Sequence, residues 1–324
     1  MLDWNFLPAG AGQAGLRRVW PFGGLGTSAP PSFLQGFPWI PPAGPHPAKA
    51  GQARASGTLA DSSVMSVSDL IYCRNITVCR GETRALDGLN LSIPSGEHVA
   101  LIGPNGCGKS TLIRTISREL HPLYDPASEL SILGKTNWNI FELRPLLGIV
   151  SDDLLRRSLR PASGRELILS GYFSTLELWP HNEVTAEMEA KADQIIELLE
   201  IEHLAQRNVS EMSSGESRRI LMGRALVHDP QALILDEPTN SLDMRSAHEL
   251  REVFRRVAQS GVGIILVTHH LPDIIPEIDR IILMKNGRVF GDGSKAEILS
   301  NGSLSKLFEM PVELIERGGY YHLI

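Results

Sequence analysis

The chain carries GPNGCGKST at residues 103–111, and this stretch decides the fold. It matches the phosphate-binding pattern G-x-x-x-x-G-K-[ST] at every fixed position. The apolar residues 99–102 before it predict a buried strand, and residues 112–116 after it predict the start of a helix. Glycines let the backbone wrap closely around an anion, and the helix N-terminus adds a partial positive charge there. The sequence therefore predicts a loop that binds a polyphosphate.

Two side chains of this phosphate loop have specific chemical roles in the prediction. Lys109 is expected to reach the β and γ phosphates, and the Ser110 hydroxyl is expected to ligate magnesium. The alternative is a glycine-rich turn that happens to precede a lysine, which the strand and helix on either side disfavour. The loop residues predicted to contact the nucleotide are Gly103, Asn105, Gly106, Cys107, Gly108, Lys109, Ser110 and Thr111.

Length and composition are those of an ordinary globular protein. The 324 residues have room for one large or two medium domains, and 42% of them are hydrophobic. The net charge of −6 is spread without long blocks of one sign, so nothing indicates a nucleic-acid partner. Cys73, Cys79 and Cys107 are too few for a disulfide framework, which favours a cytoplasmic location. No apolar run is long enough to cross a membrane, and no secretory signal is visible.

Residues 1–64 differ from the rest of the chain. They are rich in glycine and proline, contain only Asp3 and Asp61 as acidic residues, and show no period of a helix or strand. This composition predicts a disordered extension. A second interpretation is that the natural protein begins at Met65 and that the stretch before it comes from a misplaced start. Residues 65–324 are expected to form the globular domain.

The order of expected elements predicts an α/β fold. Residues 69–78 and 85–93 suggest two antiparallel strands around a turn at Gly81 and Glu82, and short strands follow within 129–150. A mainly helical subdomain is expected at about 152–228, with a helix over 187–204. Strand-length apolar runs at 232–235 and 263–267 indicate a parallel sheet covered on both faces. The chain is expected to end with a hairpin of residues 281–284 and 288–290, turned at 286–287.

Two carboxylates follow the strand expected at residues 232–235. Ligands collect at the C-terminal ends of parallel strands, so Asp236 is predicted to hold magnesium. Glu237 is the candidate general base that polarises the attacking water. An acidic pair in this place is otherwise a common helix N-cap, and the phosphate loop upstream favours the catalytic interpretation.

Two further groups are expected near a phosphate. Ser213 and Glu216 have the spacing of a capping box, and a helix N-terminus formed by small residues is also an anion site. His269 ends the strand expected at 263–267, at the same edge of the sheet as Asp236. A lone histidine is usually structural, but this position favours contact with the γ-phosphate.

Five motifs together resemble the ATP-binding-cassette (ABC) ATPases, in order and spacing, from about residue 66 to the C-terminus. They are residues 103–111, 212–216, 235–239, 241–243 and 268–269. The resemblance implies a P-loop NTPase with a RecA-like core and parallel sheet, an antiparallel β subdomain and an inserted helical subdomain. It also implies hydrolysis of ATP with Mg²⁺, in which Glu237 is the base and His269 the γ-phosphate switch.

The resemblance implies partners as well. Ser213 and Gly215 are expected to bind the ATP of a second cassette in a head-to-tail homodimer, and Glu216 and Asp243 are grouped with the nucleotide-binding residues. The chain looks most like importer cassettes of the iron-complex type, which implies a separate membrane permease and a location at the inner face of the cell membrane. Alternatives are an ABC ATPase without a permease that acts as a mechanical clamp, or an ATP-binding regulator with little turnover.

Three positions depart from the family pattern. The signature reads Met-Ser-Ser-Gly-Glu at 212–216 instead of Leu-Ser-Gly-Gly-Gln. Asp152 replaces the usual glutamine and is predicted as a further magnesium ligand. Arg80 stands where an aromatic residue normally stacks on adenine, and its guanidinium plane is expected to stack instead, which would let GTP be tolerated. Tyr172, Phe173 and Trp179 are expected either to receive a permease helix or to be buried in the helical subdomain.

Overall fold

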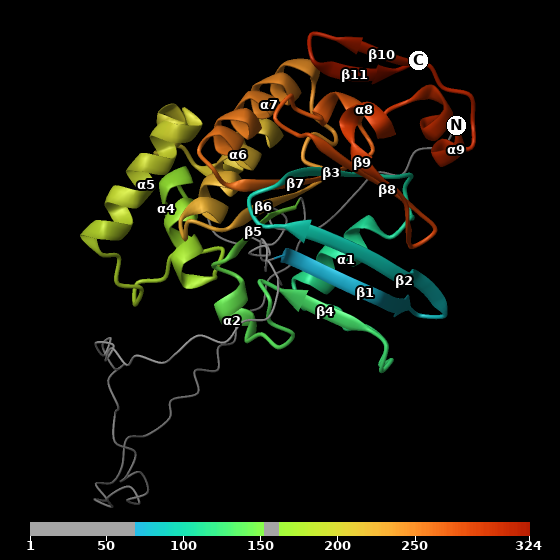
Figure 1. Cartoon of the computed structure of the whole chain (residues 1–324). Helices are drawn as coiled ribbons and strands as arrows, with labels where there is room; N and C mark the ends of the chain where they lie inside the picture. Colours follow the sequence, from blue (N-terminus) through green and yellow to red (C-terminus); the bar gives the residue numbers. More distant parts are fainter. Residues whose placement is uncertain (1–68, 152–161) are drawn as a thin grey trace, which may run out of the picture. The chain divides into compact units, whose positions relative to one another are not determined.

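The computed structural model describes residues 69–151 and 162–324. The predictions for residues 1–64 and for Asp152 therefore lie outside the described residues. Within the described part, a six-stranded, mostly parallel sheet and a three-stranded antiparallel sheet carry the fold with their helices, and a two-stranded sheet lies near the C-terminus (Figure 1).

The larger sheet has six strands in the order β5-β6-β7-β3-β8-β9. Neighbours among the first five are parallel, and β9 runs antiparallel to β8. The central strands are almost continuous apolar runs because both of their faces are covered. The order confirms the predicted parallel core. The strands are β3 (His98–Ile102), β5 (Leu147–Val150), β6 (Ala232–Asp236), β7 (Gly263–Thr268), β8 (Arg280–Lys285) and β9 (Arg288–Ser294).

The smaller sheet is antiparallel and has the order β2-β1-β4. Its strands are β1 (Asp69–Arg80), β2 (Thr83–Pro94) and β4 (Glu129–Ile132). The β1–β2 turn lies at the predicted place, and Gly81 adopts a φ of 61° that favours glycine. This sheet is the predicted antiparallel β subdomain, and helix α1 (Lys109–Ile116) is associated with it (Figure 1).

Strand β3 serves two separate cores through alternate residues. Val99 and Leu101 pack in the cluster that contains α1 and the antiparallel sheet. Ala100 and Ile102 pack in the other cluster, which contains the helices on the opposite face. Successive side chains of a strand point to opposite faces, so one short strand joins both layers.

Helices on the second face come largely from the predicted helical region. They are α4 (Gly164–Leu169), α5 (Ala186–Leu199), α6 (Ser214–Leu226) and α7 (Met244–Gln259), with 3-10 turns η1 (Ser170–Phe173), η2 (Glu202–Leu204) and η3 (Val209–Glu211). The helix predicted over 187–204 ends at Leu199, because Glu200 turns into the left-handed region with φ 54°. Short helix α2 (Ile140–Leu143) precedes β5.

The expected last hairpin is present but does not end the chain. Strands β8 and β9 turn at Asn286 and Gly287, both with positive φ, as predicted. Helices α8 (Lys295–Ile298) and α9 (Asn301–Phe308) follow, and then a second hairpin of β10 (Leu314–Arg317) and β11 (Tyr320–Leu323). The expectation that the chain ends with the first pair was wrong, because a two-glycine turn over 318–319 closes another.

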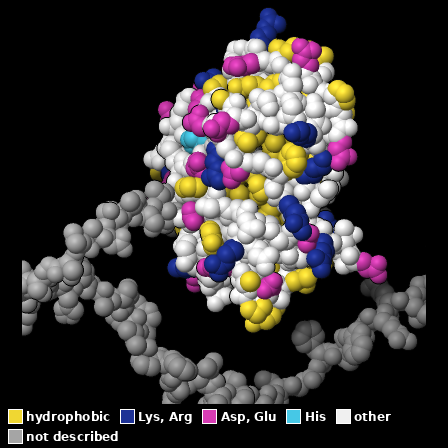
Figure 2. All heavy atoms as spheres, turned by 45° about the vertical axis from the view of Figure 1, so that its right-hand side comes forward, with side chains coloured by type: hydrophobic (Ala, Val, Ile, Leu, Met, Phe, Trp, Pro, Cys, Tyr) yellow, Lys and Arg dark blue, Asp and Glu magenta, His cyan; other side chains and the backbone are white. Residues whose placement is uncertain are grey.

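Surface charge in the described part is mixed. Acidic and basic side chains are interspersed with hydrophobic ones on the face shown in Figure 2. Within residues 69–151 and 162–324, no helix combines the length and the apolar character needed to cross a bilayer.

Candidate nucleotide-binding and hydrolysis site

The phosphate loop joins β3 to α1, as the sequence predicts. Gly108 is the N-cap of α1 with φ 111°, a backbone conformation that favours glycine. A Cβ atom at Gly108 would lie 2.5 Å from the carbonyl oxygen of Ala85, and one at Gly103 would lie 2.3 Å from that of Met284. The two glycines therefore allow neighbouring strands to approach the loop. Asn105 and Gly106 are exposed, whereas Cys107 and Thr111 are buried.

Lys109 lies folded over the loop that contains it. Its side chain is 5% exposed, and its Nζ donates to the carbonyl oxygens of Gly103 at 2.7 Å and Pro104 at 3.3 Å. The same Nζ is 3.3 Å from Glu237 Oε1. A buried ammonium group is thus placed between the loop and the carboxylate predicted as the base. A cation in this position is well placed to neutralise phosphate charge.

Asp236 ends β6 beside the phosphate loop and is hydrogen-bonded by the Ser110 hydroxyl. Burial and the neighbouring charge of Glu237 raise the pKa of Asp236 to about 6. Its Oδ1 atom is buried and has no hydrogen-bond partner within the described residues. An orphaned carboxylate oxygen next to a hydroxyl is a donor set that suits Mg²⁺, which prefers oxygen ligands and keeps several waters. The described residues contain no cluster of three or more His, Cys, Asp or Glu side chains that would hold a metal alone.

Glu237 and His269 are in direct contact. His269 Nδ1 lies 2.6 Å from Glu237 Oε2, and the His269 backbone N–H donates to the same oxygen at 3.4 Å. Glu237 has a φ of 49°, which is rare for a residue with a side chain, and its N–H donates to Val267 O at 2.8 Å. The carboxylate is therefore held between a lysine and a histidine at the C-terminal edge of the parallel sheet.

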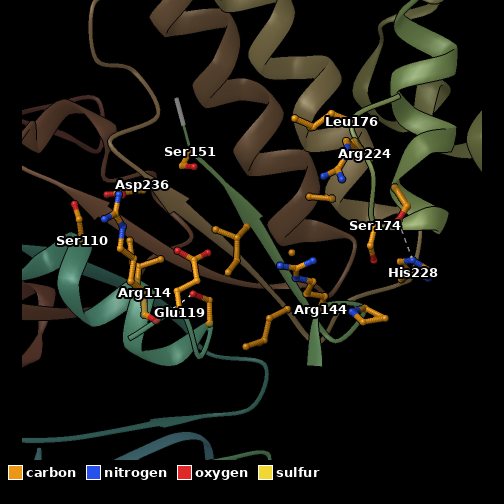
Figure 3. A pocket seen from close by; sticks show the side chains of 18 of the residues that line it. Ser110, Arg114, Glu119, Arg144, Ser151, Ser174, Leu176, Arg224, His228 and Asp236 are labelled. Atoms are coloured by element: carbon orange, nitrogen blue, oxygen red, sulfur yellow. Dashed lines mark hydrogen bonds between the residues drawn. The ribbon is translucent and has the colours of Figure 1, made fainter. Parts of the chain in front are cut away.

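A cavity of about 560 Å³ begins at these carboxylates and runs along β5 toward the helical region (Figure 3). Figure 3 shows Ser110 and Asp236 pointing toward each other at one end, with Arg224 and His228 at the other. Tyr172 packs edge-on against His228 with ring centroids 5.1 Å apart. The cavity joins the hydrolysis site to the helical subdomain.

The signature segment, residues 212–216, forms the capping box that the sequence predicts. Ser213 Oγ accepts from the N–H of Glu216 at 3.2 Å, and Glu216 Oε2 accepts from the N–H of Ser213 at 2.7 Å. Glu216 is also paired with Arg207 at 2.7 Å. Buried Gly215 lies against Ser246 of α7, since an added Cβ would be 3.0 Å from the Cβ of Ser246. Ser213 and Glu216 line a second hollow of about 730 Å³, separate from the first cavity.

Two other predicted residues, Asp243 and Arg80, line neither of these two hollows. Asp243 is the N-cap of α7 and accepts from the N–H groups of Arg245 and Ser246. Arg80 is exposed at the β1–β2 turn, where it pairs in register with Thr83. Their roles in binding nucleotide stay predictions.

The structure also shows residues that the sequence did not single out. Thr239, Thr268 and Asp273 form a buried hydrogen-bonded group beside Glu237 and His269. No local pattern pointed to Asp273, because 34 residues separate it from Thr239 along the chain. Arg114 and Arg144 line the first cavity and were likewise not anticipated.

A glycine-rich phosphate loop between a parallel strand and a helix, with an acidic pair at the end of another parallel strand of the same sheet, defines a P-loop nucleoside triphosphatase. Residues 86–240 match the family model described as ABC transporter. The uncharacterized ABC transporter ATP-binding protein YlmA of Bacillus subtilis is 31% identical over 252 residues, covering 76% of this chain and 93% of that protein. The chain belongs to the ATP-binding proteins of the ABC transporter family, and it binds and hydrolyses ATP.

Other similar proteins agree with this assignment. The hemin import ATP-binding protein HmuV of Hahella chejuensis is 29% identical over 260 residues, covering 76% of this chain and 95% of that protein. The solved structure of cbiO1 from Clostridium perfringens, part of the ABC transporter complex cbiONQ, is 27% identical with a TM-score of 0.63. It covers 74% of this chain and 94% of cbiO1. These matches confirm the predicted fold class.

Proposed function

We propose that this chain is the motor subunit of a transporter: it hydrolyses ATP with Glu237 as the general base and drives a separate membrane permease. The observation that carries the chemistry is the position of the Glu237 carboxylate, 2.6 Å from His269 Nδ1 and 3.3 Å from Lys109 Nζ. Glu237 accepts a proton from the water that attacks the γ-phosphorus, and ADP leaves as the bond between that phosphorus and the bridging β–γ oxygen breaks. Lys109 neutralises charge on the β and γ phosphates. His269 orients the carboxylate through Nδ1 and presents its other ring nitrogen to the γ-phosphate.

Ser110 and Asp236 are the residues that would hold Mg²⁺. The free Oδ1 of Asp236 and its contact with the Ser110 hydroxyl support this assignment. When bound, the ion neutralises charge on the β and γ phosphate oxygens. A cation also offsets the burial and like-charge cost of ionising Asp236 beside Glu237.

The active unit we propose is a head-to-tail homodimer. Within one chain, Ser213 and Glu216 line a hollow of their own, whereas Ser110, Asp236 and Glu237 line the other cavity. A second copy would bring its signature segment to the phosphate loop of the first. The N-terminus of α6 then adds N–H donors and a partial positive charge to the bound triphosphate.

The cavity beside β5 supports coupling to a permease. It extends from Glu237 to Arg224 and His228, so the hydrolysis site and the helical region line one continuous cavity. Trp179 is 37% exposed in this region, while Tyr172 is half-buried against His228. The relatives carry the names of transporter subunits, including hemin import proteins, which disfavours a clamp without a permease. The chain would then work at the inner face of a membrane.

The variant Glu237→Gln tests the hydrolysis and dimer proposals together. It keeps the size of the side chain and its contact with His269 but removes the base, so ATP and Mg²⁺ should bind without being cleaved. We expect turnover to fall by about 10²- to 10⁴-fold and the chain to become dimeric with ATP and Mg²⁺ in size-exclusion chromatography with light scattering. Glu277→Gln serves as a matched control with normal turnover.

A monomer of Glu237→Gln under these conditions would contradict the dimer, and normal turnover would contradict the base assignment.

A separate experiment tests for a permease partner: the tagged wild-type chain is purified from native membranes. Proteins with several apolar spans should copurify in fixed stoichiometry, and their absence would argue against a transporter subunit.

A further inference from the structure

Asp273 is a buried carboxylate that the hydrolysis chemistry described above does not use. It ends the 3-10 turn η4 (Leu271–Asp273), directly after the loop of His269, and is 1% exposed. Its Oδ2 accepts from Thr239 Oγ1 at 2.5 Å and from Thr268 Oγ1 at 3.2 Å. A buried charge of this kind is costly unless it is paired and hydrogen-bonded.

The two threonines belong to the two segments that carry the reactive groups. Thr239 follows Glu237 by two residues, and Thr268 immediately precedes His269. The Thr268 hydroxyl also accepts from the N–H of His270 at 2.9 Å, so the backbone after His269 is held from the same point. One carboxylate thus joins the segment after β6 to the last residue of β7, next to His269.

Arg251 supplies the opposite charge. Its Nη1 is 3.4 Å from Asp273 Oδ1, and its guanidinium lies over the ring of Tyr320, 5.8 Å from the ring centroid. Burial raises the pKa of Asp273, and the hydrogen bond from Thr239 and the charges of Arg251 and His270 oppose this rise. The hairpin of β10 and β11 therefore holds the cation that faces this carboxylate.

We infer that Asp273 is a positioning residue for ATP hydrolysis: it ties the Glu237 segment to the His269 segment and sets the contact between these two side chains. The β6–β7 ladder and the hydrogen bond from the Glu237 N–H to Val267 O join the two segments through the backbone, and Asp273 joins them through a buried side chain. The alternative is a purely structural role, in which loss of Asp273 lowers stability without changing the chemistry. The inference rests on the ATPase activity of this chain.

The first experiment compares Asp273→Asn with Glu277→Gln in the full-length chain. Glu277 is a matched control, because it also pairs with an arginine of α7, Arg255 at 3.0 Å, but does not contact either segment. Asp273→Asn removes the negative charge and leaves an NH₂ donor or a misplaced acceptor between Arg251 and the two threonines. We therefore expect kcat to fall by about 10- to 100-fold, the cost of misplacing reactive groups, with KM for ATP nearly unchanged. Glu277→Gln should keep both. A wild-type kcat in Asp273→Asn would overturn the inference.

A second set of variants avoids dependence on one buried substitution. Thr239→Val removes the hydroxyl that Asp273 accepts from, and Thr239→Ser keeps it. Thr239→Val should lower kcat, whereas Thr239→Ser should restore most of it, with melting temperatures measured for all. Equal kcat for the two Thr239 variants would contradict a positioning role even if Asp273→Asn fails to fold.

A double-mutant cycle separates positioning from stability. Single-turnover cleavage of ATP is measured for Asp273→Asn in the wild-type and His269→Ala backgrounds. If Asp273 acts through His269, its replacement should cost much less once His269 is gone. The same factor in both backgrounds would mean that the two residues act independently and would refute the inference. An inactive wild-type chain would instead refute the proposed ATPase.

Discussion

The phosphate-loop end and the signature end of this chain are both helix N-termini built for an anion, yet their polar groups are in opposite states. At the phosphate loop, Asp236 keeps an orphaned oxygen and has a raised pKa. At α6, Ser213 and Glu216 satisfy each other, and the hydrogen bond from the Ser213 backbone lowers the pKa of Glu216. The first site therefore has a polar atom free to bind a ligand, whereas the hydrogen bonds of Ser213 and Glu216 at the second site are already made within the chain.

The difference fits the proposed head-to-tail dimer. Buried polar groups without partners raise the free energy of the empty site. Binding of metal and phosphate lowers this free energy, so ligand binding stabilises such a site most. A satisfied cap changes little when it meets a ligand and so acts as a rigid contact surface. In the proposed dimer, the phosphate loop of one chain meets the signature segment of the other, so each site combines a reactive surface with a rigid one.

Among the variants that compare these two ends, Lys109→Ala should have the largest effect. It removes the buried ammonium between the loop and Glu237, and losing one preorganised charge donor costs about 10²- to 10³-fold in turnover. Nucleotide affinity should fall as well, measured by titration with a fluorescent ATP analogue. Lys135→Ala, which removes a lysine stacked on Trp138, is the control. Unchanged affinity and turnover in Lys109→Ala would end the assignment of this loop.

Asp236→Asn should stabilise the nucleotide-free protein while abolishing its response to Mg²⁺. The pKa of Asp236 rises to about 6 from an ordinary 3.8, so the folded state holds its proton more tightly than the unfolded state. Stability of the wild type therefore falls as pH rises from about 4 to 6, and the variant escapes about 1–3 kcal/mol of this loss.

Urea unfolding between pH 4 and 8 checks this prediction. The stability difference between Asp236→Asn and wild type should be small at pH 4, grow to pH 6 and then stay constant. Asp229→Asn replaces an exposed carboxylate and should leave the curve unchanged. A difference that does not depend on pH would show that Asp236 has an ordinary pKa.

The smallest effect separates capping from nucleotide contact at the signature end. Ser213→Ala and Ser163→Ala each remove the serine of a capping box, at α6 and α4 respectively, and each should cost about 1 kcal/mol of stability. Only Ser213→Ala should also weaken ATP-driven dimerisation, tested in the Glu237→Gln background by light scattering. If both variants dimerise equally well, Ser213 only caps α6 and does not contact the nucleotide of a second chain.

Sequence patterns predicted the parts of this site that are local. The phosphate loop, the box of Ser213 and Glu216, and the turn at Asn286 all depend on residues within a few positions of one another, so spacing alone predicts them. The sequence also predicted that the acidic pair and His269 share one edge of the sheet, because parallel strands end there, but it did not predict the direct contact between Glu237 and His269.

Long-range contacts were not accessible in this way. Asp273 meets Thr239 and Arg251 only after three separate elements have packed, and no spacing rule connects them. The hairpin of β10 and β11 was missed because its strands have only four residues each, none of them fully buried, and show little apolar alternation. The end of α5 depended on one left-handed residue, Glu200, for which glycine or asparagine is more usual.

Strand β3 has a consequence for how this chain tolerates change. Because Val99 and Leu101 belong to one core and Ala100 and Ile102 to the other, inserting one residue ahead of them would exchange the two sets. Such a chain would keep the sequence GPNGCGKST unchanged, but the strand that precedes this loop would no longer pack correctly against the two cores. A relative that carries the motif is therefore expected to be a working ATPase only if the residues that correspond to 99–102 keep the same alternation between the two cores.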